Sequence, residues 1–368
     1  MPVPQVNLKP LLRATAKEWR ANLRRLMNRA QFILGEELRG FEEEFARAMG
    51  ARFAVGVGSG TDAIELCLRD AGVSGGEVLT SALTAPFTAV AIRAAGCTPR
   101  FSDIEPATLQ MDPGDAAARI TTRTRAIVPV HLYGQPCAID VFARLARRHG
   151  LVLIQDAAQA HGARFHGRPL TAFSSYVAYS FYPTKNLGAL GDGGAILTNS
   201  PAAAKRLRTA RDGGRQGGQV SHAAGINSRL DEMQCCFLRA FLPRLDEWNT
   251  HRARLAAIYD EELTGCPGVR PGASPDVSLV KRTADSVHHI YAIRAEQRDR
   301  LREYLARYGI GTAVHYPAPL HQHPAFAQRV SLPYAECATK EILSLPLGPY
   351  LRESAARRVA ARVRRFYR

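Results

Sequence analysis

The sequence predicts an α/β protein with a mostly parallel, mixed sheet flanked by helices and a smaller C-terminal α+β part. Short apolar runs alternate with helix-like segments, as at Phe53–Val57, Ala126–Leu132 and Tyr176–Phe181. These runs are apolar throughout, which is typical of strands covered on both faces. A long helix-like segment, Asp231–Leu263, then leads into a part with fewer strand patterns.

The first 200 residues supply most of the predicted elements. Residues 12–49 carry apolar side chains at helical spacing. Three more strands are expected at Val78–Ser81, Leu151–Ile154 and Ala195–Thr198, and helices at Ala63–Arg69, Ala89–Ala95 and Val141–His149. Ligands of such sheets bind beyond the carboxyl ends of the strands, so the segments that follow the strands are the first place to seek a site.

The segment Asp231–Leu263 is expected to bend at Pro243 and to join a large domain, residues 1–248, to a small one, residues 249–368. The small domain should contain a strand at Ile290–Arg294, a helix at Arg298–Tyr308, a loop rich in proline and histidine at 315–324, and two terminal helices. The Gly-rich, polar segment Arg211–Gly225 is expected to be a mobile loop near the site.

Composition excludes several classes of protein. The chain has 368 residues, 46% of them hydrophobic, and no apolar run reaches the ~20 residues of a membrane span. The N-terminus lacks the pattern of a signal peptide. Seven cysteines, none arranged as CxxC, indicate buried thiols in a reducing compartment and no metal site. A cytoplasmic protein is expected.

The formal net charge is +16, with a pI near 9.9. Nucleic-acid binding is the alternative that such a charge suggests. The basic residues are spread over several helical segments, and 43 arginines stand against six lysines, a ratio typical of a GC-rich genome. A solvated basic surface is therefore favoured, and no nucleic-acid partner is expected.

Two side chains that follow predicted strands suggest a chemistry. Lys185 comes shortly after the strand that ends at Ser180, and Asp156 comes just after the strand that ends at Ile154. An amine that can form a Schiff base, opposite an acid that can keep a pyridine nitrogen protonated, is what a pyridoxal phosphate enzyme needs. The alternatives are a solvated loop lysine and an aspartate that caps a helix over residues 157–163.

Other residues near strand ends suit a phosphorylated, aromatic ligand. Gly60 and Thr61 open a helix after the first strand, where free N–H groups and the helix dipole attract anions. Ser180 offers a hydroxyl at a strand end, Gln159 lies one helical turn beyond Asp156, and Phe87 offers an aromatic face. Ordinary helix caps and a core phenylalanine remain alternatives.

The chain resembles the DegT/DnrJ/EryC1/StrS aminotransferases, which are sugar aminotransferases of fold type I. The matching motifs occur in family order from residue 32 to residue 350 and are FILGEELRGFEEEFA, VGVGSGTDAI, HLYGQ, QDAAQAHGA, SFYPTKNLGALGDGGAI, GINSRLDEMQ, HYPAPLH and LSLPLGPY. The resemblance implies an aspartate aminotransferase-like fold with pyridoxal 5'-phosphate as cofactor, which passes through the pyridoxamine (PMP) form.

The resemblance also implies roles for individual residues. Lys185 forms the Schiff base and is the catalytic residue, Asp156 contacts the ring nitrogen, and Gln159 contacts the ring hydroxyl. The remaining cofactor contacts are Phe87 against the ring and Gly60, Thr61, Ser180 and Asn227 around the phosphate. Asn227 is expected to reach the neighbouring subunit, so the functional unit is a homodimer with shared active sites.

HLYGQ and GINSRLDE look most like the branch that aminates nucleotide-linked 3-keto-6-deoxyhexoses, with L-glutamate as donor. The candidate sugar contacts are His161, Tyr182, His315, Tyr316 and His321. A keto-cyclitol or a 4-keto nucleotide sugar is the alternative substrate. A non-catalytic regulator is disfavoured by the intact site, and Lys185 disfavours the related dehydratases. Gln155 replaces a usual glutamate, and TAFSS at 171–175 replaces a Gly-containing turn.

Overall fold

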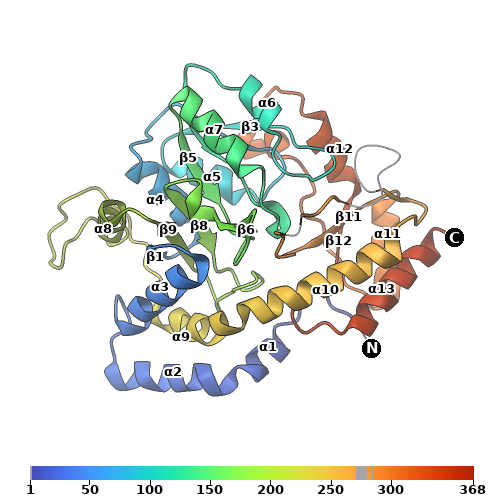
Figure 1. The fold of residues 1–368 in the computed structure, drawn as a ribbon, viewed down its shortest axis with the longest axis horizontal. Helices are drawn as coiled ribbons and strands as arrows, with labels where there is room; N and C mark the ends of the chain where they lie inside the picture. The colour runs from blue at the N-terminus through green and yellow to red at the C-terminus, as the bar shows by residue number, and fades with distance from the viewer. Residues whose placement is uncertain (1, 271–279, 284) are drawn as a thin grey trace.

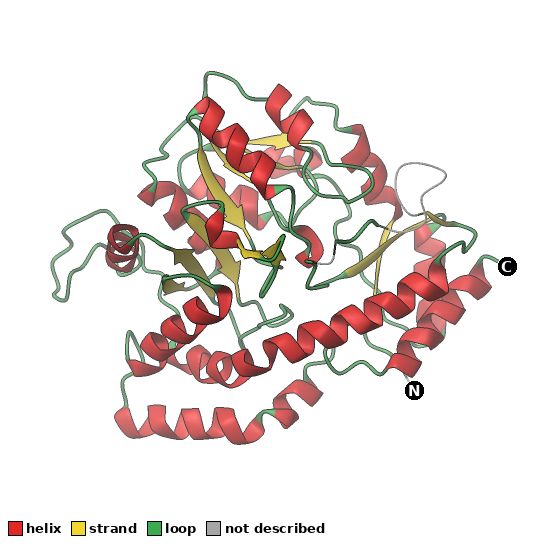
Figure 2. Cartoon of the chain, viewed as in Figure 1, coloured by secondary structure: helices red, strands yellow, loops and turns green. Residues whose placement is uncertain are grey.

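The computed structural model describes residues 2–270, 280–283 and 285–368, and it confirms the predicted fold class. A central sheet with helices around it is joined by one long helix to a smaller sheet-and-helix unit (Figures 1 and 2). The central sheet has the order β1-β9-β8-β5-β4-β2-β3. Its strands are β1 (Phe53–Val57), β2 (Glu77–Ser81), β3 (Thr98–Ser102), β4 (Thr124–Val128), β5 (Val152–Asp156), β8 (Tyr176–Ser180) and β9 (Gly194–Thr198).

The sheet is mixed because β9 runs antiparallel to both of its neighbours, β1 and β8, whereas the pairs from β8 to β3 are parallel. Side chains along β8 alternate between two cores. Val177 and Tyr179 face one core, and Ala178 faces the other. Both faces of the strand are therefore covered, which explains its continuous apolar sequence.

Helices cover the two faces of the sheet (Figure 1). One core holds α3, α9 and side chains from β8, and the other holds α4, α5 and α8. These helices and their neighbours are α1 (Lys9–Ala14), α2 (Ala16–Arg29), α3 (Glu36–Met49), α4 (Gly60–Asp70), α5 (Phe87–Ala94), α6 (Pro113–Ala118), α7 (Ile139–His149), α8 (Pro201–Ala210) and α9 (Glu232–Phe241).

The predicted break at Pro243 is confirmed. A short 3-10 turn at Leu242–Arg244 separates α9 from α10 (Leu245–Leu263), because proline lacks the N–H that would continue the helical ladder. At the start of α9, the Glu232 carboxylate accepts hydrogen bonds from the N–H groups of Gly35 (2.6 Å) and Glu37 (2.8 Å). The carboxylate thereby caps α3 and holds α9 against it.

The smaller unit has a three-stranded antiparallel sheet, β10-β11-β12, packed on helices. Its elements are β10 (Val269–Arg270), β11 (Tyr291–Ala295), β12 (Ile342–Leu345), α11 (Arg298–Arg307), α12 (Pro333–Glu341) and α13 (Glu353–Phe366). Val3 joins the core of this unit, so the first residues of the chain pack here. We propose that the large domain ends at residue 248 and that the small domain begins at residue 249, inside α10.

Several element predictions need correction. The strand expected to reach Leu132 ends at Val128, because Pro129 cannot continue the ladder. The strand expected to end at Ile154 continues as β5 through Asp156. Residues 12–49 form separate helices, and no helix follows Asp156. The elements not predicted include β3, α6, α8, β12 and the short hairpin of β6 (Arg164–Phe165) and β7 (Arg168–Pro169).

The described residues contain no helix that is both long and apolar enough to span a membrane. Within the same ranges, no group of three or more His, Cys, Asp or Glu side chains is placed to hold a metal ion. The cysteines are free thiols, and all are buried except Cys337.

Candidate active site

Lys185 lies in the turn that follows β8. Its backbone N–H donates to Tyr182 O (2.9 Å), which fixes the turn. The side chain keeps some access to solvent, yet the surrounding protein lowers the pKa of its amine to about 8, while nearby Asp156 acts in the opposite direction. Lys185 is therefore a more available nucleophile and base than an exposed lysine.

Asp156 is the last residue of β5 and is buried. Its carboxylate accepts hydrogen bonds from Thr88 Oγ1 (2.7 Å) and Ala158 N (3.0 Å). Burial raises the pKa of Asp156, whereas the two hydrogen bonds and Lys185 favour the carboxylate form. The sequence interpretation missed Thr88, although it directly follows the selected Phe87 at the start of a helix. Its place directly after Phe87 was the signal that the sequence offered.

A tight turn between β1 and α4 brings Gly60 against Ser180, and Thr61 follows in the first turn of α4. Ser59 caps α4, its side chain accepting from Asp62 N (3.1 Å). A Cβ atom at Gly60 would lie 2.6 Å from Ser180 Cβ, so only glycine allows this approach. Free N–H groups of the first turn of α4 and the Ser180 hydroxyl thus share one place suited to an anion.

Gln159 does not lie on a helix. Asp156 accepts from Ala158 N, and Gly162 adopts a positive φ of 86°, so the chain turns instead. Gln159 Oε1 accepts from Tyr133 N (2.6 Å), and its Nε2 donates to the Tyr316 hydroxyl (2.9 Å). The amide is therefore held beside Asp156 by groups that the sequence places far apart.

Tyr133 is a site residue that the sequence interpretation did not single out. It has a positive φ of 60°, and its hydroxyl donates to His315 O. The residue thus connects the segment after β4 to the loop that carries His315 and Tyr316. Its position in the HLYGQ motif was the only signal available.

Phe87 is the first residue of α5, and its side chain is 62% exposed. Because the next residue, Thr88, binds Asp156, the start of α5 lies next to the buried carboxylate. An exposed aromatic side chain at this place does not serve the core, so the structure argues against the core alternative. The stacking contact with a cofactor ring stays a prediction.

The candidate sugar contacts fall into different surroundings. His315 Nδ1 lies 2.8 Å from Ser344 Oγ, and burial, with Lys185 nearby, lowers its pKa to about 4. His161 is fully buried between the rings of Tyr179 and Phe181. The structure places these two histidines and Tyr316 around Lys185 and Gln159, and the role of each stays a prediction.

Two further candidates lie elsewhere. His321 is buried, and its Nε2 lies 3.1 Å from Glu336 Oε1 of α12. This contact ties the loop to α12, which is a structural role, and a sugar contact by His321 stays a prediction. Tyr182 is 54% exposed just before the Lys185 turn, where a ligand or a second chain can reach it.

Asn227 is exposed in the segment that returns from the Gly-rich loop, which projects beyond α8 (Figure 1). The next residue, Ser228, accepts from Gly58 N (2.9 Å) and donates to Asp62 Oδ2 (2.6 Å). The backbone of Asn227 is therefore fixed beside the turn between β1 and α4 of its own chain. Its side chain is exposed, and a contact with a neighbouring subunit stays a prediction.

Gln155, the departure beside Asp156, points to the other face of β5. Its Oε1 lies 3.0 Å from His131 Nε2, and its Nε2 donates to Leu170 O and Ser174 Oγ. Burial lowers the pKa of His131 to about 4, so a neutral amide suits a neutral imidazole. Ser174, from the unusual TAFSS turn, completes this set, so both departures meet away from Lys185.

A lysine opposite a buried carboxylate, at the carboxyl edge of a mostly parallel sheet, defines the aspartate aminotransferase-like class of fold type I. Within that class, the chain belongs to the DegT/DnrJ/EryC1/StrS aminotransferase family, whose pattern matches residues 13–364.

Similar proteins cover almost the whole chain. It is 44% identical over 368 residues to dTDP-3-amino-3,4,6-trideoxy-alpha-D-glucose transaminase of Streptomyces venezuelae, with 98% of this chain and 95% of that protein covered. It is 41% identical to a pleiotropic regulatory protein of Geobacillus stearothermophilus, with 100% and 99% covered. The crystal structure of S. venezuelae DesV with a ketimine intermediate superposes with a TM-score of 0.94 at 43% identity, with 100% and 98% covered.

The lowered pKa of Lys185 gives a prediction about pH. The neutral form of the Lys185 amine reacts with aldehydes. Its fraction should increase as pH rises through about 8, the pKa of Lys185, rather than through 10.5, the ordinary pKa of a lysine. The rate at which the cofactor-free protein binds pyridoxal phosphate covalently, followed by absorbance, should rise with a midpoint near pH 8. The Lys185→Ala variant serves as the blank, and a midpoint above pH 10 would contradict the lowered pKa.

Proposed function

We propose that the protein is a pyridoxal phosphate-dependent aminotransferase. In this proposal it moves the amino group of L-glutamate to C3 of a nucleotide-diphosphate-linked 3-keto-6-deoxyhexose. The observation that carries the proposal is the placement of Lys185 and the buried Asp156 in a chain of this aminotransferase family. A relative of 44% identity named for a 3-amino nucleotide sugar supports the choice of substrate.

The residues present fit the cofactor. At Gly60 the backbone lies so close to Ser180 that a Cβ would clash, so the free N–H groups at the start of α4 and the Ser180 hydroxyl stand together where a phosphate can bind. Asp156 is a buried carboxylate held by Thr88 and the Ala158 N–H, so it favours a proton on a ring nitrogen placed against it. When bound, pyridoxal phosphate accepts the amino group and stabilises negative charge on the donor's carbon.

The protein's own groups then have separate tasks. Lys185, whose amine has a pKa of about 8, removes and returns the proton at its Nζ atom. Gln159 presents a fixed amide, because Tyr133 N and the Tyr316 hydroxyl hold it. Since the two substrates use one site in turn, ping-pong kinetics are expected.

We further propose a homodimer with shared active sites. Phe32, Ile33, Leu190 and Met233 form an exposed apolar face, each with 39–45% of its surface accessible. Hydrogen bonds join the segments that carry them, from Glu232 N to Phe32 O (3.5 Å) and from Leu190 N to Gln234 Oε1 (2.9 Å). Apolar side chains grouped in this way favour a protein partner, and a second copy would cover them beside the Lys185 turn.

A complementation experiment tests the shared site. Lys185→Ala and Asn227→Ala protomers should each be impaired alone. After subunit exchange, a heterodimer whose Asn227 acts across the interface has one site with both lesions and one with neither. The mixture should then regain about one quarter of wild-type activity, from random pairing of two chains.

Mixtures of each variant with itself serve as the controls. If Asn227 serves its own chain, every site of the heterodimer carries a lesion and no activity returns. That result, or full activity in a strictly monomeric chain, would contradict the shared site.

The substrate is tested with glutamate and a panel of keto compounds. Amine transfer to C3 of a 3-keto nucleotide sugar, read by NMR of the product, is expected. The KM for that sugar should rise with salt if arginines bind its diphosphate, whereas a neutral keto-cyclitol should be insensitive. Amination only at C4, or only of a cyclitol, would overturn the sugar assignment and leave the aminotransferase assignment standing.

A regulator is the second candidate, because the 41% identical Geobacillus stearothermophilus relative is named as one. A regulator without catalysis would bind its ligand and leave it unchanged. Glutamate should instead abolish the visible absorbance of the lysine-bound cofactor and release 2-oxoglutarate. A spectrum that glutamate leaves unchanged would favour the regulator.

A further inference from the structure

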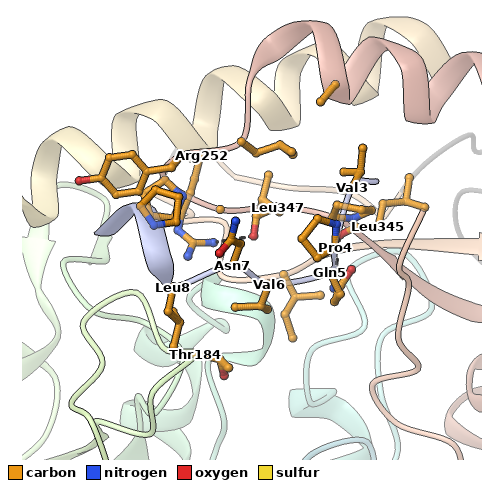
Figure 3. Close-up of a pocket in the computed structure, with 18 of the residues that line it drawn as sticks. Val3, Pro4, Gln5, Val6, Asn7, Leu8, Thr184, Arg252, Leu345 and Leu347 are labelled. Atoms are coloured by element: carbon orange, nitrogen blue, oxygen red, sulfur yellow. Dashed lines mark hydrogen bonds between the residues drawn. The ribbon is translucent and has the colours of Figure 1, made fainter. Parts of the chain in front are cut away.

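A cavity of about 730 Å³ lies between the N-terminal segment, the Lys185 turn and the smaller unit (Figure 3). Lys185 lies at one wall and Arg252 of α10 at another. The N-terminal segment is tied down by hydrogen bonds from Val3 N to Gly309 O and from Gly311 N to Val3 O, both 2.8 Å. The cavity is therefore walled by segments from both ends of the chain, next to the candidate active site.

Arg252 is buried, with 5% of its surface accessible, and its guanidinium points from α10 into the cavity (Figure 3). Its Nη1 donates to His289 O (3.3 Å) and Leu347 O (3.4 Å), whereas Nε has no partner. Among the described residues no carboxylate lies within ion-pair distance, and burial lowers the pKa of Arg252 to about 10. A buried cation with a free edge is costly unless a ligand pairs with it.

Contacts along the cavity link Arg252 to Lys185. His289 Nδ1 lies 2.9 Å from Asn186 Oδ1, and Asn186 directly follows Lys185. Burial lowers the pKa of His289 well below its ordinary value, and the charges of Lys185 and Arg252 act in the same direction. The amine and the guanidinium therefore flank one neutral histidine.

We infer that this cavity binds the amino donor and that Arg252 receives a carboxylate of it. The inference rests on the proposed function and adds the residue that recognises the donor. A planar carboxylate matches the free edge of the guanidinium with two parallel hydrogen bonds. Leu345, Leu347 and Ile290 line the same cavity and exclude water from that contact.

The alternative anion is the diphosphate of the nucleotide sugar. A diphosphate carries more charge and more oxygen atoms than one guanidinium edge can satisfy, and the other two arginines that line the cavity, Arg352 and Arg358, are exposed to solvent, whereas Arg252 is buried. A single carboxylate leaves no buried charge unpaired there. The observations therefore favour the amino acid.

Calorimetry on the cofactor-loaded protein tests the inference with glutarate, an unreactive dicarboxylate. Arg252→Gln should raise the Kd of glutarate at least tenfold, which is about 1.4 kcal/mol. It should leave the Kd of a nucleoside diphosphate unchanged, and Arg252→Lys should restore part of the glutarate affinity. Arg254→Gln, an exposed arginine on the same helix, is the matched control and should change neither value.

A second variant covers the case in which Arg252→Gln does not fold. Gly348 lines the cavity, and a Cβ there would meet no atom within 4 Å, so Gly348→Leu should fill space and keep the fold. It should also weaken glutarate binding at least tenfold.

The inference would be overturned if the wild type did not bind glutarate. It would also be overturned if folded Arg252→Gln or Gly348→Leu bound glutarate with unchanged affinity, or if Arg252→Gln weakened only the binding of the nucleoside diphosphate. None depends on turnover. The proposed function fails separately, if the wild type transfers no amine.

Discussion

The Lys185→Ala variant should lose turnover by at least four orders of magnitude, on the order of 5 kcal/mol, while its melting temperature stays near that of the wild type. Lys185 combines a lowered amine pKa with a place near the buried Asp156. The side chain lines a cavity and keeps some access to solvent, so its truncation should leave few buried polar groups without a hydrogen-bond partner. Amine transfer should be measured with the purified variant.

Lys205→Ala is the matched control, because Lys205 is an exposed lysine on α8. It should retain full activity, and it should keep the visible absorbance of the lysine-bound cofactor, which Lys185→Ala should lose. Turnover near the wild-type rate in pure Lys185→Ala protein would overturn the assignment of the catalytic residue.

The Asp156→Asn variant should bind the cofactor and yet react about a thousandfold more slowly, which is ~4 kcal/mol at ~1.4 kcal/mol per tenfold. An amide can still accept from Ala158 N and can donate to Thr88 Oγ1, so the local structure should survive. It cannot hold a proton on the ring nitrogen by charge. The rate of the glutamate half-reaction is the appropriate measurement.

Asp103→Asn is the control for this variant. Asp103 is also buried, and it accepts backbone hydrogen bonds from Tyr334 (3.0 Å) and Ala335 (2.8 Å). Its replacement should affect stability and leave the rate within about threefold, a change of ~0.7 kcal/mol. An equally small effect at Asp156 would mean that its carboxylate only supports the chain turn.

The parts of the fold that the sequence predicted are those with strong local signals. β1 and β8 are apolar throughout because helices cover both of their faces. β3, with the sequence TPRFS, was missed because it is an edge strand with a proline and partly exposed side chains. β12 was missed because it has only four residues and is held extended by pairing with β11.

The same distinction applies to the site. Lys185, Asp156 and Gly60 could be selected because each follows a strand with a recognisable pattern. For Thr88 the sequence offered only its place after Phe87, because its contact with Asp156 joins residues 68 positions apart. Tyr133 is recognised by its positive φ, and Arg252 by its place in the cavity wall. A local sequence pattern shows neither feature.

Transfer of nitrogen itself tests the central claim most directly. The purified protein, loaded with pyridoxal phosphate, is incubated with ¹⁵N-labelled glutamate and a nucleotide-linked 3-keto-6-deoxyhexose. The mass of the sugar product is then measured by mass spectrometry. We expect an amino sugar that carries the label, formed together with 2-oxoglutarate, and no such product from Lys185→Ala. A sugar that remains unlabelled and unaminated across keto sugars and keto-cyclitols, while the cofactor is bound, would contradict it.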